Sequence, residues 1–124
     1  MIDAVIERIH DPALATRSER GCIVAVVGGV LDVTRSQGLR EQLLRLVRPA
    51  SGRLVLDLSQ VTSVDVAGLA VLVGTGRRAR LFGGWLRLAS VTPAVAAAVR
   101  AAGLDRELKI FPTVRTAIDG AAPA

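Results

Sequence analysis

The chain has 124 residues, of which 51% are hydrophobic, and a formal net charge of +5 at pH 7. This length predicts one domain with a single core, and the apolar content argues against general disorder. No apolar run approaches the roughly 20 residues of a membrane span, and residues 1–20 are too charged for a signal peptide. The single cysteine, Cys22, excludes an internal disulfide, so we expect a cytoplasmic protein that does not insert into membranes.

The basic residues are spread over nearly every segment, and the densest cluster is Arg77, Arg78 and Arg80. Nucleic-acid binders usually add stacking aromatic residues or a recognition module. This chain has only two Phe, one Trp and no Tyr. We therefore interpret the cluster as a solvated helix face, with an acidic protein partner as the next alternative, and expect no direct contact with nucleic acid.

The first half of the chain alternates apolar strands with one helix. Residues 2–9 could form an edge strand, residues 11–21 are typical of a connecting loop, and residues 22–27 predict a buried strand that Gly28 and Gly29 end. Residues 30–33 are a loop or a short continuation. Residues 34–37 have the form of a capping box, which predicts the start of a helix that ends at residues 49–52.

The second half repeats the alternation. A strand over 54–58 leads through a polar loop to Asp65, the N-cap of a helix from Gly68 to about Leu81. A strand over 85–91 follows. Thr92 and Pro93 start a helix that Gly103 stops, and a strand over 108–111 and a last helix complete the order β β α β α β α β α. We expect an α/β fold, with a single mixed, largely parallel sheet of four to five strands and about four helices mainly on one face. Residues 1–119 form the domain, and residues 120–124 form a flexible tail.

No constellation of residues supports catalysis. His10 is the only histidine, and no cysteine pair exists for a metal site. The glycines at 74 and 76 lie inside a helical pattern and lack the spacing of a phosphate-binding loop. Asp32, Asp57 and Asp65 have no base or nucleophile beside them, so capping roles are the simplest account. We expect neither an enzyme nor a cofactor.

The predicted helix start at Asp65 is the most informative stretch. A cap at this residue places the free N–H groups of residues 66–68 at the positive end of the helix dipole, which suits an anion. Val66 and Ala67, however, cannot carry a phosphate. The nearest hydroxyls along the sequence belong to Thr62 and Ser63.

An ordered set of segments resembles the STAS domain of bacterial anti-sigma factor antagonists. These segments are residues 29–32, 39–40, 54–59, 61–69, 83–88 and 102–105, and the likeness extends from about residue 4 to 119. The resemblance implies a non-enzymatic switch that binds an anti-sigma factor, itself a serine kinase, and so releases a sigma factor. In that family the kinase phosphorylates a serine at the helix start, and binding is then lost.

The sequence departs from the family at this serine. Asp65, Gly68 and Leu69 fit the motif, but the acceptor position is Ala67 and the neighbouring serine is Val66. The resemblance thus implies three alternatives: an antagonist that its kinase does not switch off, control at Ser63 or Thr62, or a STAS subunit of another assembly.

The leading hypothesis is an anti-sigma factor antagonist that is not phosphorylated at the usual position. The alternatives are a STAS subunit of a transporter or a signalling scaffold, with possible self-association, and a small-ligand sensor. The expected interface combines the segments 29–32 and 61–68 with the exposed face of the second helix. Its predicted partner-binding residues are Asp32, Ser63, Asp65, Val66, Ala67, Gly68 and Leu69.

Overall fold

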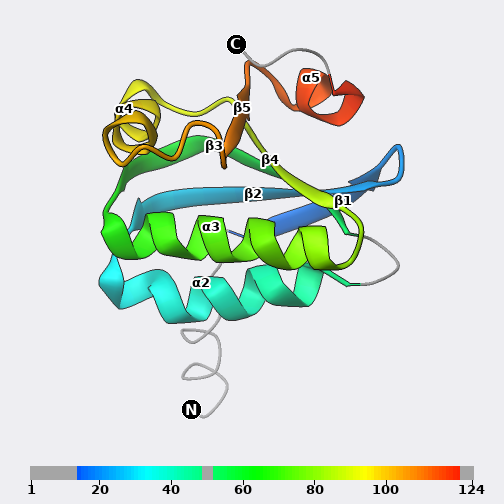
Figure 1. Ribbon diagram of the computed structural model, residues 1–124, viewed down its shortest axis with the longest axis horizontal. Helices are drawn as coiled ribbons and strands as arrows, with labels where there is room; N and C mark the ends of the chain where they lie inside the picture. The colour runs from blue at the N-terminus through cyan, green and yellow to red at the C-terminus, as the bar shows by residue number, and fades with distance from the viewer. Residues whose placement is uncertain (1–13, 49–51, 121–124) are drawn as a thin grey trace.

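Five strands form one mixed sheet in the order β1-β2-β3-β4-β5 (Figure 1). The computed structural model describes residues 14–48 and 52–120, so the edge strand predicted over 2–9 lies outside the described residues. The strands are β1 (Ala15–Glu19), β2 (Cys22–Leu31), β3 (Arg53–Val64), β4 (Trp85–Ala89) and β5 (Lys109–Phe111). β1 is antiparallel to β2, and every other pair is parallel. The predicted fold class is confirmed.

Four helices accompany the sheet: α2 (Val33–Leu46), α3 (Val66–Leu81), α4 (Pro93–Ala101) and α5 (Val114–Asp119). Figure 1 shows α2 and α3 side by side along one face of the sheet. The side chains of α5 pack against the opposite face. Asp32 caps α2 and Asp65 caps α3, as the capping roles predicted for these two aspartates required, although both helices begin earlier than predicted. The predicted capping box at 34–37 is therefore wrong, since its residues lie within α2.

The prediction of a loop over residues 11–21 is wrong, because β1 occupies Ala15–Glu19. β1 joins β2 through Arg20 and Gly21, whose φ angles of 52° and 79° suit the two-residue turn of a tight hairpin. Four of the five β1 residues are exposed. A polar strand at a sheet edge has no buried face to give it a hydrophobic period, so its pattern could not reveal it.

β2 and β3 are both longer than predicted. Gly28 and Gly29 do not end β2 but lie at two shifts of register against β3, and Gly29 has a φ angle of +82°. A strand bulge commonly needs a glycine in this conformation. The supposed polar loop after Leu58 is also strand, up to Val64. The extra length carries both strands to the point where α2 and α3 begin.

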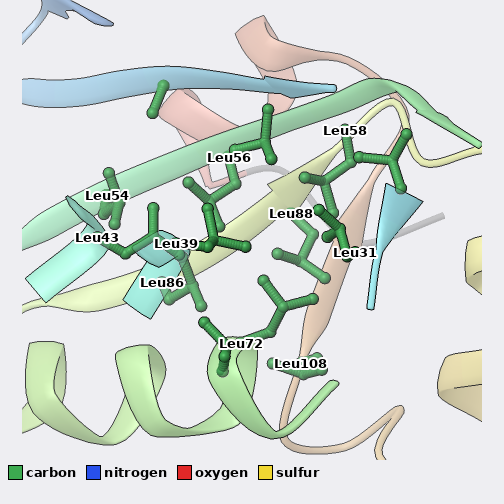
Figure 2. Close-up of a cluster of buried hydrophobic side chains, with 14 of the residues drawn as sticks. Leu31, Leu39, Leu43, Leu54, Leu56, Leu58, Leu72, Leu86, Leu88 and Leu108 are labelled. Carbon is green, nitrogen blue, oxygen red and sulfur yellow. The ribbon is translucent and has the colours of Figure 1, made fainter. Parts of the chain in front are cut away.

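The main core lies between the sheet and helices α2, α3 and α4. Figure 2 shows leucine side chains from the strands and from helices α2 and α3 pointing toward one another, and most of those it labels are less than 2% exposed. A smaller cluster on the other face joins Val24, Val55 and Phe111 to Ala117 of α5. The sheet is thus covered mainly on one face.

The predicted signals around α4 are confirmed. Thr92 caps the helix and Pro93 is its first residue. Leu104 N–H donates to the Val99 carbonyl at 2.9 Å, and Gly103 has a φ angle of +72°, which together form the predicted Schellman stop.

Candidate functional site

Asp65 joins the starts of two helices. Its Oδ1 accepts a hydrogen bond from Gly68 N–H at 3.0 Å, which caps α3. Its Oδ2 accepts a hydrogen bond from Val33 N–H at 3.1 Å. Val33 is the first residue of α2 and lies 32 positions earlier in the chain. Both N–H groups would otherwise lack intrahelical partners. One carboxylate therefore holds the two helix starts together.

Backbone contacts tighten the same joint. Asp65 N–H donates to the Leu31 carbonyl at 3.1 Å. A Cβ added at Gly68 would lie 2.4 Å from this carbonyl oxygen and 2.8 Å from Val64 Cγ2. Only glycine fits so close an approach of α3 to the end of β2. Asp32 caps α2 separately, because its Oδ1 accepts from Arg35 N–H at 3.1 Å.

Three exposed valines surround this joint. Val66 is 82% exposed, Val33 is 70% exposed and Val30 is 47% exposed. They are three of the four large hydrophobic side chains that are strongly exposed in the described residues; the fourth, Leu81, lies at the other end of α3. We call the exposed side chains of Val30, Val33, Asp65 and Val66, with Ala67 beside them, the apex surface. A group of exposed valines is typical of a protein contact.

Ala67 opens onto a groove between α2 and α3. The groove has a volume of about 330 Å³ and is lined by Ser36, Gln37, Arg40, Ala67, Ala70 and Val71. Its one hydroxyl belongs to Ser36, which donates to the Val33 carbonyl at 3.0 Å. Thr62 and Ser63 are exposed on the last residues of β3 and do not line this groove. The sequence indicated Thr62 and Ser63 but not Ser36. Ser36 lies beside Ala67 only because α2 packs against α3, a tertiary contact that the sequence does not show.

The structure separates the predicted partner-binding residues into two layers. Asp65, Val66 and Ser63 are exposed, whereas Asp32 and Ala67 are half-buried. Gly68 and Leu69 are buried, and Leu69 is only 6% exposed. These two residues lie below the surface and support it. The sequence prediction did not include Val33. This apolar residue lies off the buried face of α2 that carries Leu39 and Leu43, and that position could have indicated an exposed contact residue.

Two further features limit the chemistry of the described residues. Within them, no group of three or more His, Cys, Asp and Glu side chains is placed to hold a metal ion. In the same ranges no helix is long and apolar enough to cross a membrane. Cys22 is 3% exposed, and burial raises the pKa of its thiol, while Arg53 and Arg87 oppose that shift. It is a buried small side chain, as the sequence predicted.

The sheet, its helical cover on mainly one face and the strand-to-helix turn at Asp65 define a small α/β domain built around two linked helix starts. The chain belongs to the STAS domain family, which it matches over residues 13–117. A similar sequence is the Mycobacterium tuberculosis protein Rv2638, provisionally named an anti-anti-sigma factor. It is 34% identical over 113 residues, which cover 88% of this chain and 76% of that protein.

Solved structures agree with this fold. An anti-sigma factor antagonist from Mycobacterium paratuberculosis is similar with a TM-score of 0.77 and 24% identity, over 89% of this chain and 96% of that one. A Thermotoga maritima protein, provisionally named an anti-sigma factor antagonist, has a TM-score of 0.80 and 20% identity, over 86% of this chain and 92% of that one. The predicted family resemblance is confirmed.

Proposed function

We propose that this protein is a cytoplasmic anti-sigma factor antagonist. It binds a serine-kinase anti-sigma factor through the apex surface and thereby releases a sigma factor for transcription. The observation that carries the proposal is the exposure of Val30, Val33 and Val66 around the joint at Asp65. Leaving large aliphatic side chains in water costs free energy that a partner surface would recover. The names of the similar proteins indicate which partner class to test first.

The proposed complex is not switched off at the usual position, because Ala67 has no hydroxyl. A phosphate near the start of α3 would add about −1.5 to −2 charge in the middle of the apex surface. Ala67 keeps this surface uncharged apart from Asp65, whose two oxygens already bind backbone N–H groups. The antagonist would then remain competent for binding while its kinase is active.

A pair of matched substitutions tests the binding surface. Val66 and Leu81 are 82% and 81% exposed at opposite ends of α3, so Val66→Lys and Leu81→Lys make the same chemical change at equally exposed sites. With purified anti-sigma factors of the source organism, calorimetry should show that Val66→Lys weakens binding by about tenfold or more. Leu81→Lys should leave the affinity unchanged. Equal losses in both variants, or no binding to any of these anti-sigma factors, would refute the proposal.

A kinase assay tests the second part. After incubation with the bound anti-sigma factor and ATP, mass spectrometry should find no phosphate on Ser36, Thr62 or Ser63. Ala67→Ser should become phosphorylated in the same reaction and then lose affinity. Phosphate on any of these three residues of the unaltered protein would show that regulation has moved to another hydroxyl. A tightly bound Ala67→Ser that stays unmodified would count against a kinase partner.

A further inference from the structure

We propose that a second site, at the end of the sheet opposite the apex surface, binds a small polyanion such as a phosphate ester or a polycarboxylate. A cavity of about 460 Å³ opens where β4 and β5 begin and α3 ends. Its size falls within the range of small-molecule sites. The side chains that give it its character are Arg80, Trp85, Arg87, Arg106, Glu107 and Lys109.

The charge of this lining is strongly unbalanced, with four cationic side chains and one carboxylate. That carboxylate, Glu107, already pairs with Arg77 at 3.1 Å and with Arg80 at 3.8 Å. Among the described residues, Arg106 and Lys109 have no ion-pair partner within reach. A concave surface with unmatched positive charge focuses the field and attracts anions more strongly than a flat one.

Arg87 supplies a second, independent reason. The centre of its guanidinium lies 3.6 Å from the ring centroid of Trp85, and its Nη1 donates to the Ala117 carbonyl at 2.8 Å. These two contacts fix a half-buried cation that no described carboxylate pairs with. Burial lowers the pKa of Arg87, which indicates that its charge is incompletely solvated. An anion in the cavity would supply the missing countercharge.

The register of the strands sets these groups side by side. Arg87 pairs with Lys109 across β4 and β5, so the two side chains leave the sheet on the same face. Arg106 comes from the turn that leads into β5, and Arg80 from the last turn of α3. Cations from two strands, one turn and one helix therefore border the same cavity at this edge of the sheet, Arg80 from the face that carries α3 and Arg87 from the face that carries α5. A ligand with two or more anionic groups is the species that can engage several of them at once.

The site is independent of the apex surface. α3 has 16 residues, so Val66 and Leu81 are separated by a helix about 24 Å long. Figure 1 shows this helix running along the sheet from one end of the strands to the other. A polyanion bound where α3 ends would not touch the proposed partner surface. The proposal that a polyanion binds here therefore does not depend on the proposed function.

Trp85 makes the proposal directly measurable, because it is the only tryptophan in the chain and lies in the cavity. Titration with inorganic pyrophosphate and, separately, with citrate should change its fluorescence in a saturable way. We expect a dissociation constant below about 1 mM, and weaker binding as salt is added. Binding of pyrophosphate alone would narrow the class to phosphorylated ligands, and binding of citrate as well would extend it to polycarboxylates.

A charge-matched control separates a site from general attraction. Arg106→Gln with Lys109→Gln removes two cations from the cavity, and Arg45→Gln with Arg115→Gln removes two from exposed positions elsewhere. The first double variant should bind at least tenfold more weakly, and the second should bind like the unaltered protein. Equal weakening in both would mean that only net charge attracts the anion. That result, or the absence of saturable binding by fluorescence and calorimetry, would overturn the proposal.

Discussion

Replacing Gly68 with alanine should break the joint between the two helix starts. The added Cβ would meet the Leu31 carbonyl oxygen at 2.4 Å and Val64 Cγ2 at 2.8 Å. The carbonyl cannot simply move away, because it accepts the hydrogen bond from Asp65 N–H. Overpacking at a rigid site costs 1–3 kcal/mol, so we expect a loss near the upper end, about 3 kcal/mol, in the free energy of unfolding.

Gly74 of the same helix is the matched control. A Cβ at Gly74 would meet no heavy atom within 4 Å. Alanine there should stabilise the protein by about 0.5–1 kcal/mol, because glycine is the poorer helix former. In urea unfolding, Gly68→Ala should lower the midpoint by roughly 1.5 M, whereas Gly74→Ala should raise it slightly. If Gly68→Ala were as stable as Gly74→Ala, the close approach of α3 to β2 would not be a constraint on this fold.

Three further results follow from the same geometry. Asp65→Asn keeps one carbonyl oxygen for the α3 cap but loses the second acceptor for Val33 N–H, so urea unfolding should show a loss of about 1 kcal/mol, against about 2 kcal/mol for Asp65→Ala. Ala67→Glu places an anion in the first turn of α3, which should leave stability unchanged or raise it by about 0.5 kcal/mol while abolishing partner binding in calorimetry. Burial raises the pKa of the Cys22 thiol above its usual 9.0, so above about pH 9 the thiol ionises more readily in the unfolded chain. Stability should therefore fall as pH rises through this range, and Cys22→Ala should show a smaller fall; identical pH profiles would contradict the assignment.

The sequence predicted the elements whose signals are local. Thr92 and Pro93 start α4, and Gly103 stops it, as the capping chemistry of these residues indicated. Asp65 was likewise predicted as an N-cap. Such signals depend on hydrogen bonds that span only a few residues, so no knowledge of the fold is needed to interpret them.

Most differences between the predicted and observed structure arise where tertiary contacts decide the structure. The start of α2 is an exception in part: the capping-box pattern predicts it at residue 34, whereas the local Asp32 cap begins the helix at Val33, and only the bond from Val33 N–H to Asp65, 32 residues away, depends on the fold. From sequence alone, Gly28 and Gly29 of β2 predict a strand end, because a bulge is defined only against the neighbouring strand. The sequence did not predict the cavity of the proposed polyanion site for the same reason. Arg80 and Lys109 are far apart in the sequence and meet only through the fold.

The joint also changes how the missing serine should be understood. Asp65 and Gly68 fit the family motif, and their presence could be taken as the trace of a phosphorylation switch. The structure gives both residues a role in the fold that does not require phosphorylation. Asp65 accepts hydrogen bonds from the N–H groups of two helices, and Gly68 allows α3 to approach the end of β2. Ala67 has no comparable constraint, since its side chain opens onto a groove. The hydroxyl at this position can therefore be absent without loss of the fold, and in the proposed complex the apex surface would keep its partner while the kinase is active.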